Sequence, residues 1–264
     1  MSLLLAVGLV WVAAAAVMAL AWLRQRSTRN ATLVDAVWAG ALACAALFYG
    51  LVGAGSASAR FGVAVLGALW GFRLCLHVLN RALNEDEDGR YAYLRRHWRD
   101  DQLKFFLFYQ AQALLVVLFS LPFAAAAWNP DLDLLPWGLA AVAVWVLALA
   151  GETVADRQLA AWRAHPGNRG RACRAGLWRY SRHPNYFFEW LHWFAYVLLA
   201  VGSPVAWLAW LGPLLMFASL NWITGIPYTE AQALRSRGDD YRRYQAETSR
   251  FFPWPPRAQP NPSA

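Results

Sequence analysis

LLLAVGLVWVAAAAVMALAWL, residues 3–23, is a run of apolar side chains without a single charge. The hydrocarbon core of a bilayer is about 30 Å thick, and a helix needs about 20 apolar residues to cross it. The run therefore predicts a membrane-spanning helix. A signal peptide is the alternative, but the run has no basic region before it and its arginines follow it. We therefore expect a retained anchor.

Further apolar runs of this kind divide the rest of the chain. They cover about Leu33–Gly53, Phe61–Leu79, Phe105–Ala127, Trp137–Gly151, Tyr186–Val201 and Val205–Ile223. The composition agrees, because 59% of the residues are hydrophobic and only 15% are charged, against about a quarter in soluble domains. We expect an all-α, polytopic membrane helical bundle of about seven transmembrane helices. It forms one domain over residues 1–252, and residues 253–264 form a Pro-rich tail.

The positions of the arginines indicate how this bundle is oriented. They follow the first span, separate the third from the fourth and the fifth from the sixth, and follow the seventh. The alternate loops contain only Arg60. Because basic loops favour the cytoplasm, we expect the N-terminus outside and the C-terminus in the cytoplasm. The net charge of +8 lies between apolar runs rather than on one soluble face, so we expect no nucleic acid partner.

Metal binding is not expected from the cysteines. Cys44, Cys75 and Cys173 are scattered. Their spacing matches neither a metal site nor a disulfide framework.

Two polar motifs lie close to the second and third spans. Asp35, in V-D-A-V-W-A-G, stands near the cytoplasmic end of the second span, and a carboxylate in hydrocarbon costs about 2.5–3.5 kcal/mol. Asp35 is therefore either functional or a cap at the interface. The charged loop after the third span is either solvated or a binding element. In the second case Arg90 and Arg95 meet phosphates, and Tyr91 stacks or donates a hydrogen bond.

The polar segment between the fifth and sixth spans contains the most candidates. From Gly151, G-E-T-V-A-D-R-Q-L-A-A-W-R has helical periodicity that places Glu152, Asp156 and Arg163 on one face. A basic turn follows. Pro184 then suits the first position of a helix, where its missing N–H is no loss.

The helix that begins at Pro184 is expected to carry a polar stripe. Asn185, Glu189, His192 and Tyr196 share one face, since positions i, i+4, i+7 and i+11 align on a helix. The helix start suits a phosphate or another anion, and the stripe would line a polar cleft. Alternatively, the stripe only bonds neighbouring helices.

The last polar motif, G-I-P-Y-T-E-A-Q-A-L-R-S-R-G-D-D-Y-R-R-Y, follows the seventh span. Gly225 and Pro227 end that span. A short helix with Tyr228 and Glu230 follows, and Gly238 breaks it. The alternative is an amphipathic helix on the membrane surface, although its apolar face is weak.

Taken in order, these motifs resemble the steroid 5α-reductase family, specifically its bacterial DUF1295-type branch. The matching stretches are V-D-A-V-W-A-G at 34, E-D-G-R-Y at 87, E-T-V-A-D-R-Q-L at 152, S-R-H-P-N-Y-F-F-E-W at 181, and G-I-P-Y-T-E with D-Y-R-R-Y near the end. They cover nearly the whole chain. The wider superfamily also contains sterol reductases and isoprenylcysteine or phospholipid methyltransferases, which share R-H-P. Asn185 and Glu189 favour the reductases. The family usually has Gly where this chain has Phe188.

The resemblance implies an NADPH-dependent oxidoreductase that reduces the C=C bond of an α,β-unsaturated ketone in a steroid or lipid enone. The cofactor site would face the cytoplasm from a bacterial cytoplasmic membrane. The residues that the resemblance assigns to NADPH are Asp156, Arg163, Arg171, Arg174, Arg182, His183, Asn185, Tyr186, Glu189, Tyr228, Glu230 and Tyr244. The four arginines would hold phosphates, and Asn185 and Glu189 would position the nicotinamide.

Asp35 and Tyr91 are the candidates for the catalytic acid near the substrate carbonyl. Burial would favour a protonated Asp35, since a carboxyl group removed from water prefers its neutral form. Arg73 or His77 could occupy the same region instead.

Two other classes of protein remain open. An S-adenosylmethionine-dependent membrane methyltransferase shares the R-H-P motif, and a non-enzymatic receptor or scaffold could also have seven spans. The sequence has no G-x-G-x-x-G loop. NADPH binding is therefore expected from the resemblance and the basic segments alone.

Overall fold

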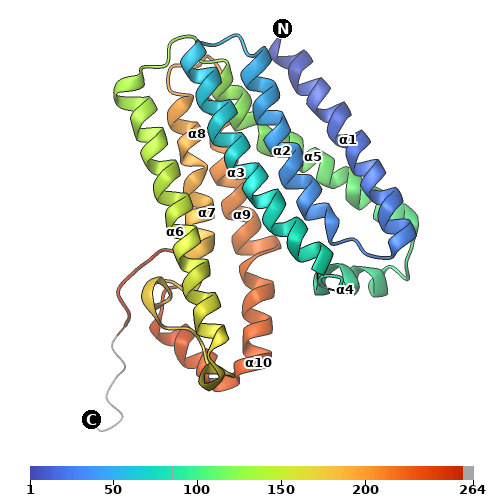
Figure 1. Cartoon of the computed structure of the whole chain (residues 1–264), viewed down its shortest axis with the longest axis vertical. Coiled ribbons are helices and arrows are strands. Elements are labelled where there is room, and N and C mark those ends of the chain that lie inside the picture. Colours follow the sequence, from blue (N-terminus) through green and yellow to red (C-terminus); the bar gives the residue numbers. More distant parts are fainter. Residues whose placement is uncertain (85, 258–264) are drawn as a thin grey trace. The chain divides into compact units, whose positions relative to one another are not determined.

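The computed structural model describes residues 1–84 and 86–257, and these residues form helices and connecting turns without a strand (Figure 1). They group into two compact units. Unit 1 consists of Met1–Ala141 with Tyr196–Gly212, and unit 2 consists of Val142–Ala195 with Pro213–Ala264. The end of the expected Pro-rich tail, residues 258–264, lies outside the described residues.

Ten α-helices are described, and some contribute to both units. Those that begin in unit 1 are α1 (Leu3–Thr28), α2 (Leu33–Val52), α3 (Ala57–Asn84), α4 (Gly89–His97), α5 (Gln102–Ala127), α6 (Leu139–Ala164) and α9 (Leu211–Ala218). Those that begin in unit 2 are α7 (Pro184–His192), α8 (Phe194–Leu199) and α10 (Ile226–Glu247). Short 3-10 or π turns lie at Leu134–Gly138, Pro166–Asn168, Gly176–Arg179, Ala206–Trp210 and Ser219–Ile223.

The predicted all-helical membrane bundle is confirmed, with six rather than seven helical stretches long and apolar enough to cross a bilayer. These are Leu3–Thr28, Leu33–Val52, Ala57–Asn84, Gln102–Ala127, Leu134–Ala164 and Ala206–Glu247. The predicted span over 186–201 is wrong as a single helix, because a turn at Trp193 divides it into α7 and α8. The polar stripe is divided at the same place, with Asn185, Glu189 and His192 on α7 and Tyr196 on α8.

The last of the six stretches is longer than a bilayer requires. It has 42 residues, and about 20 suffice to cross. Residues 206–225 carry no charge, whereas the sequence from Glu230 onward is rich in charge. The membrane-crossing part therefore ends near Gly225, and α10 lies beyond it. This new helix begins at Ile226, next to the predicted stop at Gly225 and Pro227, and the predicted break at Gly238, with φ of 52°, kinks it.

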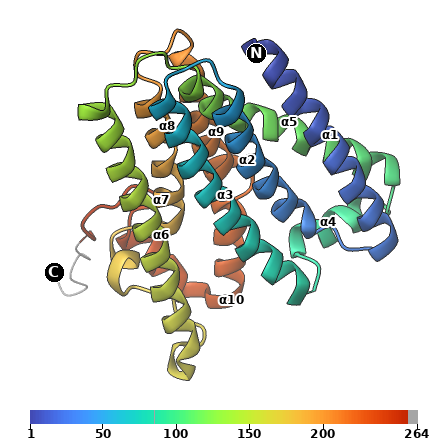
Figure 2. The ribbon, with the colours of Figure 1, turned by 45° about the horizontal axis from the view of Figure 1, so that its top comes forward.

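Small residues bring α2 and α3 of unit 1 into close contact (Figures 1 and 2). Gly67 faces Ala46, Gly71 faces Ala43, and Gly50 lies against Ala64 so closely that a Cβ on any of these glycines would clash. Without a hydrophobic drive between helices in lipid, such close backbone packing supplies the association energy. This pair forms the centre of unit 1.

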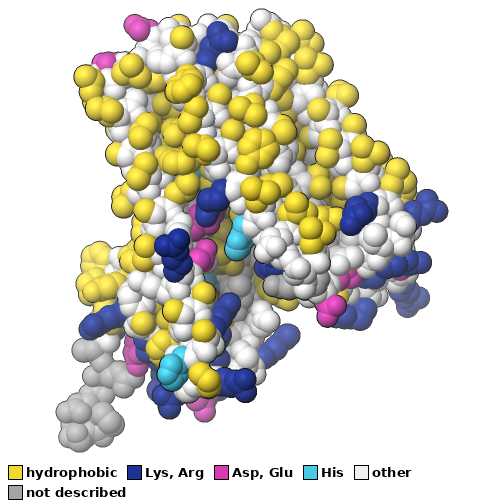
Figure 3. Space-filling view, viewed as in Figure 1, with side chains coloured by type: hydrophobic (Ala, Val, Ile, Leu, Met, Phe, Trp, Pro, Cys, Tyr) yellow, Lys and Arg dark blue, Asp and Glu magenta, His cyan; other side chains and the backbone are white. Residues whose placement is uncertain are grey.

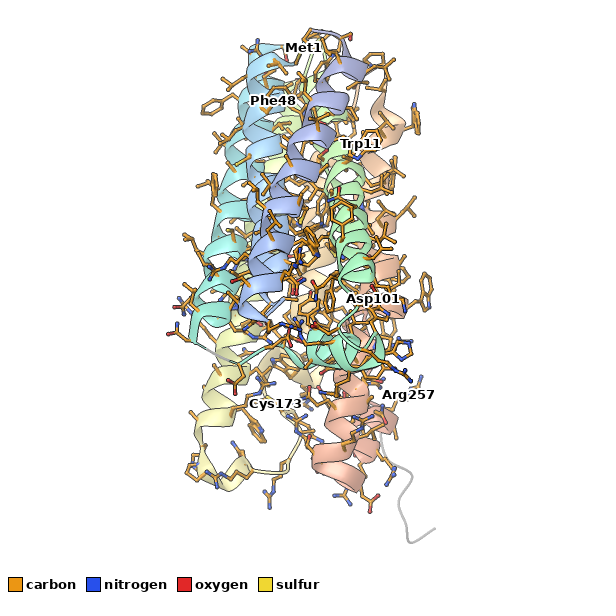
Figure 4. The ribbon with its side chains drawn as sticks, turned by 90° about the vertical axis from the view of Figure 1, so that its right-hand side faces the viewer. Met1, Trp11, Phe48, Asp101, Cys173 and Arg257 are labelled. Carbon is orange, nitrogen blue, oxygen red and sulfur yellow. The ribbon has the colours of Figure 1, made fainter. Side chains whose placement is uncertain are left out.

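Exposed apolar side chains cover much of the helices of unit 1, and a group of basic side chains lies around α4. Large apolar side chains such as Leu4 and Leu51 are exposed, at 85% and 74%, as expected for helices that face hydrocarbon. Figure 3 shows these apolar side chains over the helices and Lys and Arg side chains gathered around α4. In Figure 4, Met1 and Phe48 lie at one end of the unit and Asp101 at the other.

In unit 2 the long connection between α6 and α7 is held against helices on both sides. The indole N–H of Trp178 donates to the Ala155 carbonyl at 2.9 Å, and the Tyr244 hydroxyl donates to the Trp178 carbonyl. Gly176 has a positive φ of 56°, and the Gln158 side chain fills the space of a Cβ, so both features require glycine here. Ala172, Ala233, Tyr241 and Tyr244 form the local apolar core.

Candidate active site

One polar cluster of unit 1 consists of Asp35, Asp88, Arg90 and Tyr91, and we call it the Asp35 cluster. The Tyr91 hydroxyl donates to Asp35 Oδ1 at 2.6 Å, and Arg90 Nη2 donates to Asp35 Oδ2 at 2.9 Å. Asp88 caps the start of α4 and binds the Arg90 guanidinium. The two residues predicted to share the acid role, Asp35 and Tyr91, are thus in direct contact although 56 positions separate them.

Both carboxylate oxygens of Asp35 accept hydrogen bonds within this cluster, one from a phenol and one from a guanidinium. Burial, and then the negative charge of Asp35, raise the pKa of Tyr91 well above its usual value of 10. Tyr91 therefore keeps its proton at neutral pH.

The loop before α4 is neither freely solvated nor open to a phosphate. Arg95 binds Glu87 at 2.8 Å and Asp100 at 2.6 Å, and the backbone N–H of Asp88 donates to Thr32. Arg90 is likewise engaged by carboxylates. These bonds attach the loop to the start of α2 and so fix Tyr91 beside Asp35.

An apolar groove of about 710 Å³ also runs along α2, but on another side of the helix. Leu33, Val37, Gly40 and Cys44 line it. Asp35 follows Leu33 by two positions, which is about 200° around a helix with 3.6 residues per turn. The groove is therefore not part of the Asp35 cluster.

A second polar cluster, in unit 2, surrounds Glu230 and consists of Arg182, His183, Glu230, Tyr241 and Gln245. Arg182 Nε donates to Glu230 Oε1 at 2.7 Å, and His183 Nε2 lies 3.2 Å from the same oxygen. Gln245 donates to Oε2 at 3.0 Å. Arg182 also donates to the carbonyls of Gln245 and Thr248. We call this the Glu230 cluster.

The electrostatics of the Glu230 cluster follow from burial and from these bonds. Burial raises the pKa of Glu230, but the hydrogen bonds from His183 and Arg182 outweigh it and lower that pKa from 4.5 to about 2. Burial also lowers the pKa of His183, against the raising effect of Glu230. At neutral pH the cluster is thus an arginine–glutamate ion pair with a neutral imidazole that donates Nε2–H.

Some of the other predicted residues of α6 and α7 contact one another. Asn185 Nδ2 donates to Asp156 Oδ1 at 3.1 Å, so these two predicted cofactor residues are joined. The Tyr186 ring stacks on His183 with centroids 5.5 Å apart. The side chain of Glu189 lies on the same α7 as Asn185, 4.0 Å from His192 Nδ1. Pro184 is the first residue of α7, as predicted.

The four arginines predicted to bind phosphates have different surroundings. Arg174 is ion-paired with Asp240 at 3.1 Å and lies near Glu247 at 3.5 Å, and Arg182 belongs to the Glu230 cluster. Arg163 and Arg171 are exposed. In the described part of the chain, neither of their side chains has a hydrogen bond or ion pair.

Arg237 is a basic residue that the sequence interpretation missed. Its charge and that of Arg163 both act on the thiol of Cys173, lowering a pKa that burial raises. Two like charges from α6 and α10 thus approach one another. In the sequence, only the position of Arg237 directly before Gly238 could have indicated that it approaches Arg163.

The two tyrosines that the resemblance assigns to NADPH also differ in their surroundings. Tyr228 is exposed, at 41%, whereas Tyr244 is 2% exposed and donates to the backbone of the α6–α7 connection. The Tyr244 contacts therefore support the fold of unit 2.

Phe188, which stands where the family usually has glycine, packs against a glycine of α6. Its ring occupies the space beside Gly151 of α6 that a Cβ would fill. The bulky ring thus fits because the residue opposite it on α6 is a glycine.

The described residues define an all-helical membrane protein with two hydrogen-bonded, partly buried polar clusters. The chain belongs to the family described as "Protein of unknown function (DUF1295)", which matches residues 21–248. That family is associated with steroid 5α-reductase-like proteins. An uncharacterised protein of the fission yeast Schizosaccharomyces pombe is 28% identical, over 86% of this chain and 73% of the yeast protein. No solved structure matches the chain.

Proposed function

We propose that this protein is an NADPH-dependent reductase that saturates the C=C bond of an α,β-unsaturated ketone in a steroid-like or other lipid substrate. The observation that carries the proposal is the Asp35–Tyr91 pair, a buried phenol held by a carboxylate at 2.6 Å. The family association with steroid 5α-reductase-like proteins supports the same reaction class.

The acid half of the reaction is assigned to Tyr91. Reduction of an enone places negative charge on the carbonyl oxygen, and a donor aimed at that oxygen stabilises it. The Tyr91 hydroxyl can turn about its C–O bond away from Asp35, and Arg90 then keeps the Asp35 charge paired. Because its pKa is raised, Tyr91 still has a proton to donate at neutral pH.

The residues of unit 2 fit a dinucleotide in their donor chemistry. Arg163, Arg171 and Arg237 offer guanidinium groups that no carboxylate of the described chain neutralises through an ion pair, and phosphates are natural partners for such groups. Asn185, held by Asp156, and Glu189 would orient the nicotinamide end. When bound, NADPH supplies the hydride, and the protein supplies orientation and charge. We place this side of the protein in the cytoplasm, on the distribution of arginines.

The test compares three cofactors on one purified protein. We expect NADPH to raise the unfolding temperature of the detergent-solubilised chain, and NADH to do so less. A ligand at about 100 times its Kd stabilises by about 2.7 kcal/mol. Stabilisation by S-adenosylmethionine instead would make the protein a methyltransferase and reject the proposal.

A matched pair of variants locates the cofactor site. Arg163→Gln should weaken NADPH more than NADH if this side chain meets the 2′-phosphate. Arg157→Gln removes the same charge from another exposed position of α6 and should leave both affinities unchanged. Equal losses in the two variants would reject the assignment of Arg163.

A further inference from the structure

The last described residues of unit 2 fold back along the start of α7. We call residues 249–257 the C-terminal strap. The backbone N–H of Arg182 donates to the Ser249 carbonyl, and the Ser181 hydroxyl donates to the Phe251 carbonyl. The backbone N–H of Trp254 donates to Tyr180, and that of Arg257 donates to the Glu247 carbonyl, each at 2.9 Å. The strap is thus bonded along its length.

Between the strap and the end of α10 lies a cavity of about 300 Å³ with a basic lining. Arg182, Arg250 and Arg257 line it, together with a single carboxylate, Glu247. That carboxylate already lies 3.5 Å from the guanidinium of Arg174, which is not part of the lining. Arg182 is paired with Glu230, so the excess of positive charge in the cavity comes from Arg250 and Arg257.

The donors in this lining are only partly used. Arg182 is 8% exposed, and its Nε and Nη1 are bonded to Glu230 and to two carbonyls. No protein atom of the described residues accepts a hydrogen bond from its Nη2. Arg250 Nη2 donates to the Asn221 carbonyl at 2.7 Å, which anchors that side chain. A buried guanidinium with an unused donor, beside two further arginines, suits an anion with several oxygen acceptors.

The surroundings of the cavity indicate where this anion comes from. Trp254 lines the cavity and is 70% exposed, and Phe252 on the same strap is 50% exposed. Trp222, next to the Arg250 anchor at Asn221, is 67% exposed. Aromatic side chains of this kind gather at the level of lipid headgroups, and arginine near that level recognises anionic lipids.

We propose that the cavity under the C-terminal strap binds the phosphate of an anionic phospholipid headgroup. The three arginines hold the phosphate, while Phe252 and Trp254 lie among the adjoining acyl chains. This site is separate from the proposed cofactor residues Arg163 and Arg171. A free phosphate ion and the phosphates of a nucleotide share the same chemistry, so the experiment must distinguish these sources from the lipid.

The test measures lipid binding to the full chain in detergent micelles. Phosphatidylglycerol and phosphatidylcholine with the same acyl chains are titrated separately, and the bound lipid is counted by native mass spectrometry. We expect the wild type to bind phosphatidylglycerol at least about tenfold more tightly, and the Arg250→Gln, Arg257→Gln double variant to lose that preference. Arg182 is left intact, because it supports the fold.

The matched control is the double variant Arg242→Gln, Arg243→Gln on α10, which removes two exposed charges that do not line the cavity. It should retain the preference. An equal loss in both double variants, or no preference in the wild type, would overturn the proposal. Displacement of the lipid by inorganic phosphate or NADPH at equal concentration would also overturn it. Thermal stabilisation by NADPH should persist in the variant that lacks Arg250 and Arg257. The lipid site and the reductase proposal can therefore be refuted separately.

Discussion

The fit of Phe188 against Gly151 allows a sharp test of how α6 and α7 pack. A Cβ added at Gly151 would lie 2.5 Å from Phe188 Cζ, with two further ring atoms equally close. An ordinary carbon contact is about 3.5–4.0 Å, so Gly151→Ala falls short by about 1 Å. Because the ring is rigid and set in the bundle, the helices must shift to accept the methyl group.

Two opposing terms set the size of the effect. Overpacking costs about 1–3 kcal/mol, while alanine is favoured over glycine inside a helix by about 1 kcal/mol. Gly151→Ala should therefore destabilise the wild type by up to about 2 kcal/mol. With Phe188→Leu in place the clash is relieved, and the same substitution should become neutral or stabilising. The coupling between the two positions is then about 1–3 kcal/mol.

The assay is thermal unfolding in detergent, followed by tryptophan fluorescence. For a chain of this size 1 kcal/mol corresponds to about 2–4 °C. Gly8→Ala in α1 is the control, because nothing lies within 4 Å of its added Cβ, and it should only gain stability. The close packing of Phe188 against Gly151 is refuted if Gly151→Ala raises the unfolding temperature as Gly8→Ala does. It is also refuted if Gly151→Ala has the same effect with and without the Phe188 ring.

Three further predictions concern other parts of the molecule. Because the folded pKa of Glu230 is about 2 and its ordinary value is 4.5, its contribution to stability, on the order of 3 kcal/mol, is complete above pH 4.5 and is lost as the pH falls towards 2. Acid titration of unfolding should show this loss in the wild type but not in Glu230→Gln. Tyr91→Phe removes a hydrogen bond to the Asp35 carboxylate and should lower the free energy of unfolding by about 1.5–3 kcal/mol. In the proposed reductase it should also lower enone turnover and leave NADPH affinity unchanged. An unchanged turnover would exclude Tyr91 from the acid role. Gly67→Leu should disrupt the contact with α2, whereas Leu69→Ala, at a side chain 56% exposed, should change the unfolding temperature little; similar losses from both would contradict the α2–α3 interface.

The membrane helices could be predicted from the sequence because length and apolar content alone determine whether a segment can cross a bilayer. The exception, residues 186–201, is instructive. The chain turns at Trp193, and neither a glycine nor a proline marks that position in the sequence. Hydropathy therefore indicates one segment where the backbone forms two helices, α7 and α8.

Site residues were predictable where the family resemblance gave two residues a shared role, but the partners that the fold alone selects were not. The resemblance paired Asp35 with Tyr91, and the structure brings them into contact. It could not show that Arg174 meets Asp240, 66 positions away, or that Arg182 meets Glu230, 48 positions away. An arginine available for phosphate and one paired with a carboxylate look alike in a sequence, because the difference depends on the fold.

Arg60 has a consequence for how the chain is assembled during its synthesis. Its guanidinium donates to the carbonyls of Gly50 and Leu51, which belong to the last turn of α2 and have no partner within that helix. The first turn of α3 thus closes the end of α2, and the glycine and alanine contacts close the space between them. A helical hairpin that satisfies the polar groups at its own turn can bury that turn in the bilayer before later segments are made.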